Sequence, residues 1–318
     1  MTPPIAHKVG AVIDERKLPP LIVLAGATAT GKTSLSLELA QRIPGAEIVS
    51  ADSRQVYRGM DIGTAKVTAA EQGLVPHHCI DLVNPDEPFT ATDYQRAASQ
   101  SLEGIAARSG VALLVGGTGL YLRAVARGVP LDETGRDEQL RMELEQRLAD
   151  DGLAPLVAEL HERAPGVASR TDLANPRRVV RALERVSVAG DRSPPEPRGY
   201  PARSVWIGLS LDPSENAQRI AERAGAQFHG GLIEEARMLR DRYGESPRSF
   251  SATGYREAFD VIDGISTLDE AIDRNVARNR QLARRQRTWF RAEPDINWLD
   301  ATSPTLIEEA LAIAIVGR

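Results

Sequence analysis

Eight residues near the start of the chain match a phosphate-binding loop. The pattern G-x-x-x-x-G-K-[ST] is met by Gly26, Ala27, Thr28, Ala29, Thr30, Gly31, Lys32 and Thr33. An apolar run, 21–25, precedes it and a helix-compatible run, 33–42, follows it, which is the strand–loop–helix setting that this motif requires. Backbone N–H groups of such a loop cradle phosphate oxygens, while the lysine adds charge and the threonine hydroxyl holds magnesium. The pattern predicts a diphosphate or polyphosphate site with Mg²⁺ at Thr33, but it does not identify the phosphate carrier.

A carboxylate, Asp52, follows the next apolar run, 46–51. Because the carboxyl ends of parallel strands meet at one edge of a sheet, we expect Asp52 beside the phosphate loop, as a magnesium ligand through water or as a general base. An aspartate that only caps the next turn is the alternative. A third apolar run, 111–115, ends in Gly-Gly-Thr-Gly, where a phosphate-loop ATPase would carry a second acid. This departure counts against ATP hydrolysis. The glycines either let the backbone approach a ligand, with Thr118 as a hydrogen-bonding group, or form an ordinary turn.

Arginines at helical spacing give a third chemical signal. Arg177 and Arg181 are four residues apart, as are Arg219 and Arg223, which could close on a bound diphosphate. The stretch 274–291 has seven arginines and no acidic residue. Four of them fall on one stripe of a helix: Arg280, Arg284, Arg287 and Arg291. Such a stripe favours the phosphates of a nucleic acid, and a solvated face or a structural arginine network is the alternative.

Composition limits the remaining choices. The chain has 318 residues, a formal net charge of −5 and one cysteine, Cys79. A lone cysteine excludes an internal disulfide and a multi-cysteine zinc site, and a small buried thiol is its expected role. The acidic balance argues against a globally basic nucleic-acid binder but not against a local basic surface. With neither a signal-peptide core nor a membrane-length apolar run, we expect a cytoplasmic protein.

Strands that alternate with helices predict an α/β fold with a parallel sheet. We expect strands at 21–25, 46–51, 111–115 and 205–211, and helices at 33–42 and 92–108. Residues 132–202 read as a helical insertion, with leucines at 140, 144 and 148 and a proline-rich end. The expected organisation is a flexible extension at 1–19, a phosphate-loop α/β core at 20–131 and 203–318 with a mostly helical C-terminal part, and the insertion between the two core segments.

Taken in order, these motifs resemble one family, the tRNA dimethylallyltransferases, also called tRNA isopentenyl or IPP transferases, in their bacterial form. The resemblance extends over residues 20 to 300. Its pieces are 26–33, Asp52-Ser53-Arg54-Gln55-Val56-Tyr57, 59–66, 76–81, Gly116-Gly117-Thr118-Gly119-Leu120-Tyr121, 175–184, 253–257 and 284–290. The chain departs from the family pattern in four ways: Ala27 stands where proline is common, Arg54 occupies a position that varies in the family, the N-terminal extension is extra, and there is no C-terminal zinc finger. The last departure fits the bacterial form.

The resemblance implies a phosphate-loop fold with a helical insertion that embraces the anticodon stem. It implies transfer of the dimethylallyl group from dimethylallyl diphosphate to N6 of the adenosine just 3′ of the anticodon, in tRNAs that read codons beginning with U. Magnesium is the implied cofactor, and tRNA and dimethylallyl diphosphate are the implied partners. We expect a monomer without an obligate protein partner or a membrane association. The diphosphate would then be a leaving group, which explains a phosphate loop without an ATPase acid.

Residue roles carry over by position. Asp52 matches the general base, Lys32 and Thr33 the diphosphate and magnesium site, and Thr118 a catalytic position that also contacts tRNA. Arg223, together with Arg219, matches the diphosphate-binding arginine position. The residues matching tRNA contacts are Asp52, Ser53, Arg54, Gln55, Thr118, Arg141, Arg177, Arg178, Val179, Val180, Arg181, Ser251, Ala252, Thr253, Gly254, Tyr255 and Arg256. From the arginine stripe, we add Arg280, Arg284 and Arg287 as tRNA contacts.

Three other functions remain as alternatives. A related enzyme class prenylates free adenine nucleotides, although a mononucleotide acceptor needs neither the insertion nor the arginine-rich helix. A small-molecule kinase would turn over magnesium–ATP without dimethylallyl diphosphate. A non-catalytic RNA-binding module would have no need for Lys32, Thr33 and Asp52.

Overall fold

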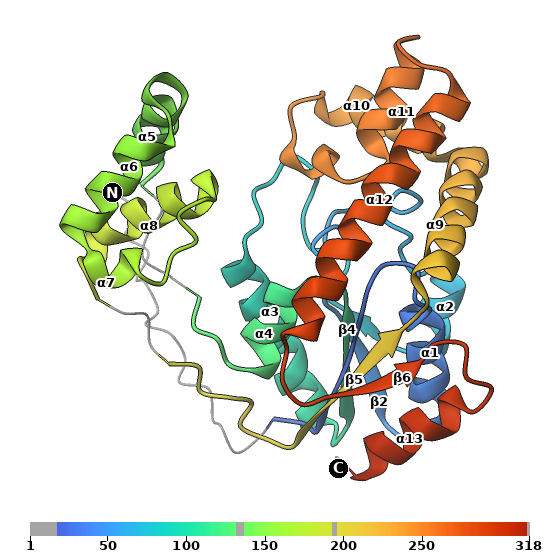
Figure 1. The fold of residues 1–318 in the computed structure, drawn as a ribbon. Coiled ribbons are helices and arrows are strands. Elements are labelled where there is room, and N and C mark those ends of the chain that lie inside the picture. The colour runs from blue at the N-terminus through green and yellow to red at the C-terminus, as the bar shows by residue number, and fades with distance from the viewer. Residues whose placement is uncertain (1–17, 132–136, 193–195, 317–318) are drawn as a thin grey trace, which may run out of the picture. The chain divides into compact units, whose positions relative to one another are not determined.

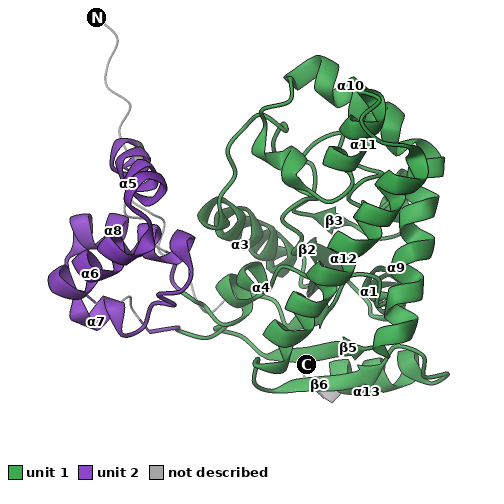
Figure 2. Ribbon diagram, turned by 45° about the horizontal axis from the view of Figure 1, so that its top comes forward, with its two compact units in different colours: residues 1–129, 198–318 green, residues 130–197 purple. Residues whose placement is uncertain are grey.

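A computed structural model of the chain describes residues 18–131, 137–192 and 196–316. The expected extension at 1–19 lies outside the described residues except for its last two. The fold divides into two compact units, one made of Met1–Val129 with Arg198–Arg318 and the other of Pro130–Pro197 (Figure 2). The smaller unit is an insertion in the sequence of the larger one, and each unit has its own hydrophobic core.

A six-stranded sheet forms the centre of the larger unit (Figure 1). Its strands are β1 (Leu21–Gly26), β2 (Ala46–Ser50), β3 (His77–His78), β4 (Val111–Gly116), β5 (Ser204–Ser210) and β6 (Ile296–Asp300). They lie in the order β3-β2-β4-β1-β5-β6, and every neighbouring pair is parallel. The structure confirms the parallel α/β prediction and its four strands. The sequence analysis missed the two edge strands, β3 and β6.

Helices pack on both sides of this sheet. The larger unit contains α1 (Lys32–Arg42), α2 (Ala69–Leu74), α3 (Ala91–Ala107), α4 (Gly119–Ala126), α9 (Pro213–Gln227), a π-helical turn (Phe228–Leu232), α10 (Ile233–Tyr243), a 3-10 turn (Arg248–Ser251), α11 (Tyr255–Ile262), α12 (Leu268–Arg291) and α13 (Leu306–Val316). A capping box between Thr267 and Glu270 begins α12, the long helix that carries the arginine stripe. No helix among the described residues is long and apolar enough to cross a membrane.

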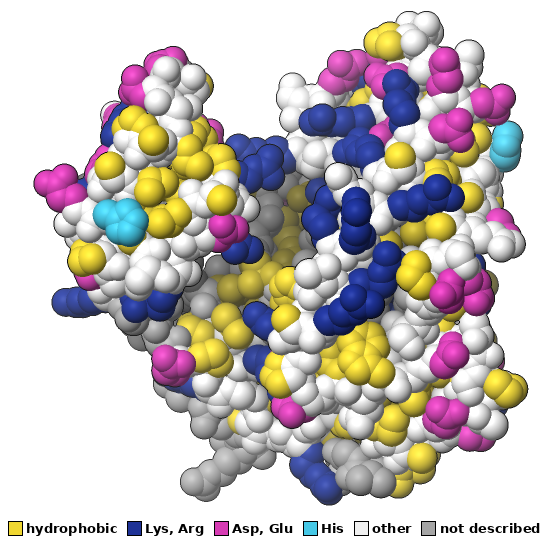
Figure 3. Space-filling model, viewed as in Figure 1, with side chains coloured by type: hydrophobic (Ala, Val, Ile, Leu, Met, Phe, Trp, Pro, Cys, Tyr) yellow, Lys and Arg dark blue, Asp and Glu magenta, His cyan; other side chains and the backbone are white. Residues whose placement is uncertain are grey.

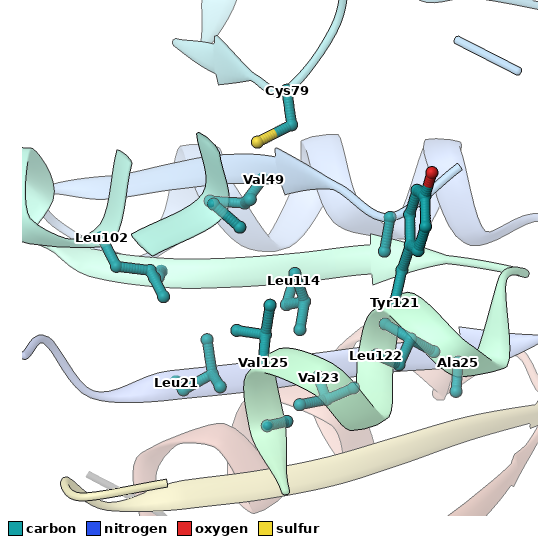
Figure 4. Close-up of a cluster of buried hydrophobic side chains, with 14 of the residues drawn as sticks. Leu21, Val23, Ala25, Val49, Cys79, Leu102, Leu114, Tyr121, Leu122 and Val125 are labelled. Carbon is teal, nitrogen blue, oxygen red and sulfur yellow. The ribbon is translucent and has the colours of Figure 1, made fainter. Parts of the chain in front are cut away.

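Side-chain alternation along the strands builds two core layers. On β1, Leu21, Val23 and Ala25 pack with α3 and α4, as the close-up of that cluster shows (Figure 4). Ile22 and Leu24 point to the other face and pack with α1 and α13. The buried thiol of Cys79 lies in the first layer, as predicted. Burial between two layers fixes the register of β1 and thereby the start of the phosphate loop.

A third apolar cluster supports the segment that follows β2. Val56, Tyr57 and Met60 pack against the helical segments from the π-helical turn to α12, with Phe228 and Phe250 among the buried partners. This cluster fixes the chain just beyond Asp52, so the C-terminal helices help to build the edge of the sheet where the strands end.

The smaller unit is a bundle of short helices. It contains α5 (Glu138–Asp151), α6 (Leu153–Arg163), α7 (Pro165–Ala168) and α8 (Pro176–Ala189). Leu144 is buried with side chains of α6 and α8, while Leu140 and Leu148 pack against the same cluster. The leucine spacing seen in the sequence therefore forms the inner face of α5. Residues 132–136 and 193–195 of the expected insertion lie outside the described residues.

Candidate active site

The phosphate loop connects β1 to α1, and two of its residues have a left-handed backbone. Ala29 has φ 62° and Gly31, which immediately precedes α1, has φ 91°. A Cβ built on Gly31 would meet only Arg219 Nη1, at 4.0 Å. The space between Gly31 and Arg219 is therefore open beside the first N–H groups of α1. An anion bound there would satisfy N–H groups that have no partner within the helix.

Two cationic side chains converge on this loop. Lys32 Nζ donates a hydrogen bond to Ala27 O at 2.6 Å, and Arg223 on α9 donates to Thr28 Oγ1. The pKa of Lys32 is lowered to about 8, mainly by burial and then by the charge of Arg223, while the Asp52 carboxylate opposes the shift. Burial also lowers the pKa of Arg223, again against the field of Asp52. A bound anion would relieve the repulsion between these two cations.

Asp52 begins the turn directly after β2. Its Oδ1 accepts a hydrogen bond from the Arg54 backbone N–H at 2.8 Å, so the capping role considered above is real. The side chain is only half-buried, and among the described residues no hydrogen bond to Oδ2 is found. One carboxylate oxygen thus holds the turn while the other can accept a proton.

Thr118 lies next to this turn. Its Oγ1 accepts a hydrogen bond from the Ser53 backbone N–H at 3.1 Å, and its own N–H donates to Ala51 O at 3.2 Å. These bonds join the loop after β4 to the loop after β2. The structure therefore brings together Lys32, Arg223, Asp52 and Thr118, the residues expected to be catalytic, at the carboxyl ends of β1, β2 and β4.

Magnesium can be accommodated at Thr33, which is exposed in the first turn of α1. The described residues contain no cluster of three or more acidic, histidine or cysteine side chains that could hold a metal alone. Mg²⁺ commonly keeps several waters and binds through substrate phosphates and one or two protein groups. A single hydroxyl beside a candidate anion site fits that donor set. Arg219 lies nearby and forms an ion pair with Glu215 at 2.6 Å.

The glycines after β4 approach protein atoms rather than open space. A Cβ on Gly116 would overlap Ala51 O, and one on Gly117 would overlap Nε2 of Gln286. At Gly119 it would lie 2.5 Å from the Trp289 ring. The sequence alone suggested a backbone that approaches a ligand or an ordinary turn. The structure shows close packing of this loop against the β2 loop and α12.

The side chains of Arg54 and Gln55 form hydrogen bonds with neighbouring segments of the protein. Arg54 donates to Ser249 O at 3.4 Å and to Ser251 Oγ at 3.2 Å, linking two of the segments expected to contact tRNA. Gln55 accepts from Ser50 Oγ at 3.0 Å, and its Nε2 donates to two carbonyls of the loop 59–66. Ser53 remains half-buried beside Asp52. This part of the site is a hydrogen-bonded framework with partly exposed polar edges.

The segment from Ser251 to Arg256 is largely internal. The Ala252 side chain is buried, and Tyr255 is 0% exposed with its hydroxyl bonded to Glu235 Oε1 at 2.7 Å. Glu235 also accepts hydrogen bonds from three consecutive backbone N–H groups at 61–63. Both side chains belong to the packing that holds loop 59–66, and the expected RNA contact at these two positions stays a prediction. Gly254 is also buried, whereas Thr253 is half-buried and Arg256 is exposed.

Basic side chains follow α12 on one face of the larger unit (Figure 3). Arg280 and Arg284 are exposed and Arg287 is half-buried. With residues of α9, these arginines line a cavity of about 570 Å³. Beneath them, Ala283 packs with Ile220 and with Ala27 of the phosphate loop. The arginine stripe therefore lies on one face of α12, while Ala283 lies on a face that packs against the rest of the unit.

In the smaller unit, Asn175 caps the start of α8. Arg177, Arg178 and Arg181 are exposed there. Val179 and Val180 are buried in the core of the unit, and the expected RNA contact at these two positions stays a prediction. Arg141 on α5 forms an ion pair with Glu184 at 2.6 Å and is half-buried.

Sequence reasoning missed two side chains at the site, Gln286 and Asn216. Gln286 Oε1 accepts from the Thr28 N–H at 2.8 Å, and Asn216 Nδ2 donates to Thr28 O at 2.9 Å. Both lie more than 180 residues away from Thr28 along the chain. Gln286 stands among the stripe arginines, and no local pattern distinguishes a glutamine that faces inward.

The chain is similar to known proteins over most of its length. The family model of IPP transferase matches residues 55–293. A tRNA dimethylallyltransferase of Roseiflexus castenholzii is 44% identical over 92% of this chain and 97% of that protein. One of Picosynechococcus sp. is 42% identical over the same shares of the two chains.

A solved structure of a similar protein has a similar fold. The crystal structure of a tRNA isopentenylpyrophosphate transferase from Bacillus halodurans superposes with a TM-score of 0.68, at 39% identity, over 93% of this chain and 94% of that chain. Sequence identity and fold thus agree over nearly the whole length. The chain belongs to the IPP transferase family, the family of the tRNA dimethylallyltransferases.

Proposed function

We propose that this chain transfers the dimethylallyl group from dimethylallyl diphosphate to N6 of the adenosine on the 3′ side of the anticodon, in tRNAs that read codons beginning with U. The products are N6-dimethylallyladenosine and diphosphate. One observation carries the proposal: the phosphate loop, two cations and the Asp52 carboxylate share one site, whereas the loop after β4 is closed by packing and has no acid. This arrangement suits a leaving diphosphate better than a hydrolysed ATP. Membership of the IPP transferase family supports it.

Departure of the diphosphate is an electrostatic problem. As the bond between the allylic carbon and the diphosphate oxygen breaks, its electron pair goes to the leaving group. Lys32, Arg223 and the N–H groups at the start of α1 would neutralise that charge, with Arg219 closing the open side at Gly31. The Thr33 hydroxyl would hold Mg²⁺, which supplies further charge neutralisation of the diphosphate.

Attack by the acceptor needs an oriented amine and a base. N6 of adenosine forms the new bond to the allylic carbon, and one of its protons passes to the free oxygen of Asp52. The bonds from Thr118 to Ser53 and Ala51 fix the Asp52 turn relative to the loop after β4. An adenine stacked in the anticodon loop cannot reach such a site, so the base is turned out of its stack before reaction.

The exposed arginines are the proposed tRNA contacts. In the larger unit they are Arg256, Arg280, Arg284 and the half-buried Arg287, beside the polar edges of Ser53 and Arg54. In the smaller unit they are Arg177, Arg178 and Arg181 with Arg141, for which we propose contact with the anticodon stem. The protein would act in the cytoplasm as a monomer, without a protein partner.

Mass spectrometry of tRNA incubated with the protein, Mg²⁺ and dimethylallyl diphosphate tests the reaction directly. One dimethylallyl group should appear on the adenosine 3′ of the anticodon, and a stem-loop with that base replaced by guanosine should gain none. Faster prenylation of AMP than of the stem-loop would instead identify an adenine-nucleotide prenyltransferase. Turnover of ATP in the absence of dimethylallyl diphosphate would identify a kinase or hydrolase.

A second experiment tests the arginine contacts. Replacing Arg280, Arg284 and Arg287 by Gln should weaken tRNA binding and reduce the slope of log K against log salt by roughly 0.7–0.9 for each lost phosphate contact. Exposed Arg242 on α10 offers a matched control, since its Gln variant removes a charge away from the α12 stripe. An unchanged slope in the triple variant would mean that the stripe is a structural or solvated face.

A further inference from the structure

Thr28, in the phosphate loop, has every polar group bonded to a side chain from a distant part of the sequence. Its N–H donates to Gln286 Oε1 at 2.8 Å, its carbonyl accepts from Asn216 Nδ2 at 2.9 Å, and its hydroxyl accepts from Arg223. Asn216 is itself held by Arg287, whose Nη1 donates to Asn216 Oδ1 at 3.0 Å. The shape of the phosphate loop therefore depends on α9 and α12 as well as on its own sequence.

Gln286 also holds a second loop. Its Nε2 donates to Gly117 O at 3.0 Å, so the two ends of one carboxamide bridge the phosphate loop and the loop after β4. The residue after Gly117 is Thr118, which is bonded to the Asp52 turn through Ser53. A single side chain thus spans the leaving-group side and the acceptor side of the site.

The contacts of the Gln286 carboxamide define the geometry of this bridge. Its two partners, an N–H and a carbonyl, determine which end of the amide points to which loop. A Cβ on Gly117 would overlap Gln286 Nε2, while its next neighbours would be Gln286 Cδ at 3.4 Å and Gly26 O at 3.6 Å. Only the flexible end of Gln286 stands in the way of an alanine at this position.

We propose that Gln286 is a positioning residue for the transfer: it holds the diphosphate loop in register with the Thr118 and Asp52 loops. The identity of the acceptor rests on the proposed function. In-line attack requires the leaving group and the amine at a defined separation, and misplacement by about 1 Å can cost on the order of 100-fold in rate. Loss of the bridge should therefore affect turnover and diphosphate binding more than RNA binding.

Two variants break the bridge in different ways. Gln286→Ala removes both hydrogen bonds, and Gly117→Ala pushes the amide out by steric overlap. Each should lower kcat by about 10- to 100-fold and weaken binding of inorganic diphosphate with Mg²⁺ by several-fold, with KM for an anticodon stem-loop changed less than about threefold. Gln218→Ala is the control, because this exposed glutamine on α9 bonds only to Glu222 among the described residues. It should behave as the unmodified protein.

The double variant Gln286→Ala, Gly117→Ala decides the mechanism. If Gly117→Ala acts by displacing Gln286, the double variant is no worse than Gln286→Ala alone, since the overlap has disappeared. Additive losses would overturn the proposal, as would a kcat and a diphosphate Kd within twofold of the unmodified protein in Gln286→Ala. Thermal unfolding of all variants separates loss of the bridge from loss of the fold.

Calorimetry with inorganic diphosphate and no RNA separates this inference from the proposed function. If no RNA is prenylated by the unmodified protein, but both single variants weaken diphosphate binding non-additively, the acceptor assignment fails and the positioning role stands. If RNA is prenylated and the variants bind and react normally, the positioning role fails alone.

Discussion

Two glycine-containing loops lie at the same edge of the sheet, yet Gly31 of the phosphate loop meets different surroundings from the glycines of the other loop. In the phosphate loop, Gly31 has φ 91° and open space in front of it, bounded by Arg219 at 4.0 Å from a built Cβ. At the end of β4 and in the loop that follows, a Cβ on Gly116 or Gly119 would overlap Ala51 or the Trp289 ring, and one on Gly117 would displace the end of the Gln286 side chain. The first loop leaves room for a ligand and the second makes room for protein. Similar compositions therefore serve binding in one case and assembly of the site in the other.

If the two loops differ in this way, the largest loss of turnover should come from removing the charge of the phosphate loop. Replacing Lys32 by Met removes a cation that faces the leaving group, and turnover should fall by about 100- to 1000-fold, the range found when one preorganised transition-state partner is lost. The global stability should remain nearly unchanged, because the hydrogen bond that Lys32 donates among the described residues, to Ala27 O, lies within its own loop. Single-turnover kinetics and thermal unfolding measure the two effects. A large stability loss with normal turnover would give this loop the structural role assigned to the other one.

Asp52 lies in the turn after β2, the strand next to β4, and its charge acts on Lys32 of the phosphate loop. Its replacement should show the next largest effect. Asp52→Ala should lower turnover by at least about 100-fold, as expected for a general base, with tRNA affinity nearly retained. Asp52→Asn is the matched variant, because its amide oxygen can still accept the Arg54 N–H bond that holds the turn. Turnover in Asp52→Asn that is as low as in Asp52→Ala supports proton transfer. Recovery of activity in Asp52→Asn would show that the turn, and not the base, matters.

A matched pair of glycine substitutions compares the loops directly. Gly116→Ala should destabilise the fold by about 1–3 kcal/mol, the usual cost of overpacking, because its Cβ overlaps Ala51 O in the sheet edge. Gly31→Ala has free space, so strain from its positive φ should cost only about 1 kcal/mol, while diphosphate binding weakens because the methyl group occupies the open side. Denaturant unfolding and diphosphate titration of both variants would check this. Equal stability losses with equal binding would erase the distinction.

The contrast also explains how much the sequence could reveal. The phosphate loop, its flanking strand and helix and the position of Asp52 depend on local patterns, and the structure has them where they were expected. The edge strand β6 was missed because its run Ile-Asn-Trp-Leu-Asp is mixed in polarity and only Leu299 is buried. Gly116 to Gly119 could be recognised as special, but their partners, Gln286 and Trp289, lie about 170 residues away.

Buried polar pairings set the same limit elsewhere. Glu235 accepts hydrogen bonds from the Tyr255 hydroxyl and from three N–H groups of the loop 59–66. A carboxylate that satisfies several donors at once can hold a loop in place, and neither spacing nor composition shows which donors it will meet. Such contacts arise only when the chain has folded. The sequence therefore predicts the reactive residues of the site better than the buried hydrogen bonds that hold its loops in place.

The smallest effect concerns pH and depends on Lys32 alone. Its pKa of about 8 means that its ammonium group begins to lose its proton just above neutral pH when the site is empty. A bound diphosphate favours the charged lysine and raises that pKa, so binding takes up a proton in this range. Affinity for dimethylallyl diphosphate should therefore be full below about pH 8 and fall as pH rises, by up to about 10-fold per pH unit until the pKa of the complex is reached. Titrations from pH 7 to 9.5 measure the slope, with Lys32→Arg as the control because arginine stays charged throughout. If the affinity of the unmodified protein does not change with pH, Lys32 does not contact the diphosphate. If the affinity falls with pH and Lys32→Arg abolishes that fall, the cation next to the leaving group is the lysine of the phosphate loop. No group of the packed loop after β4 is then needed to explain the pH dependence.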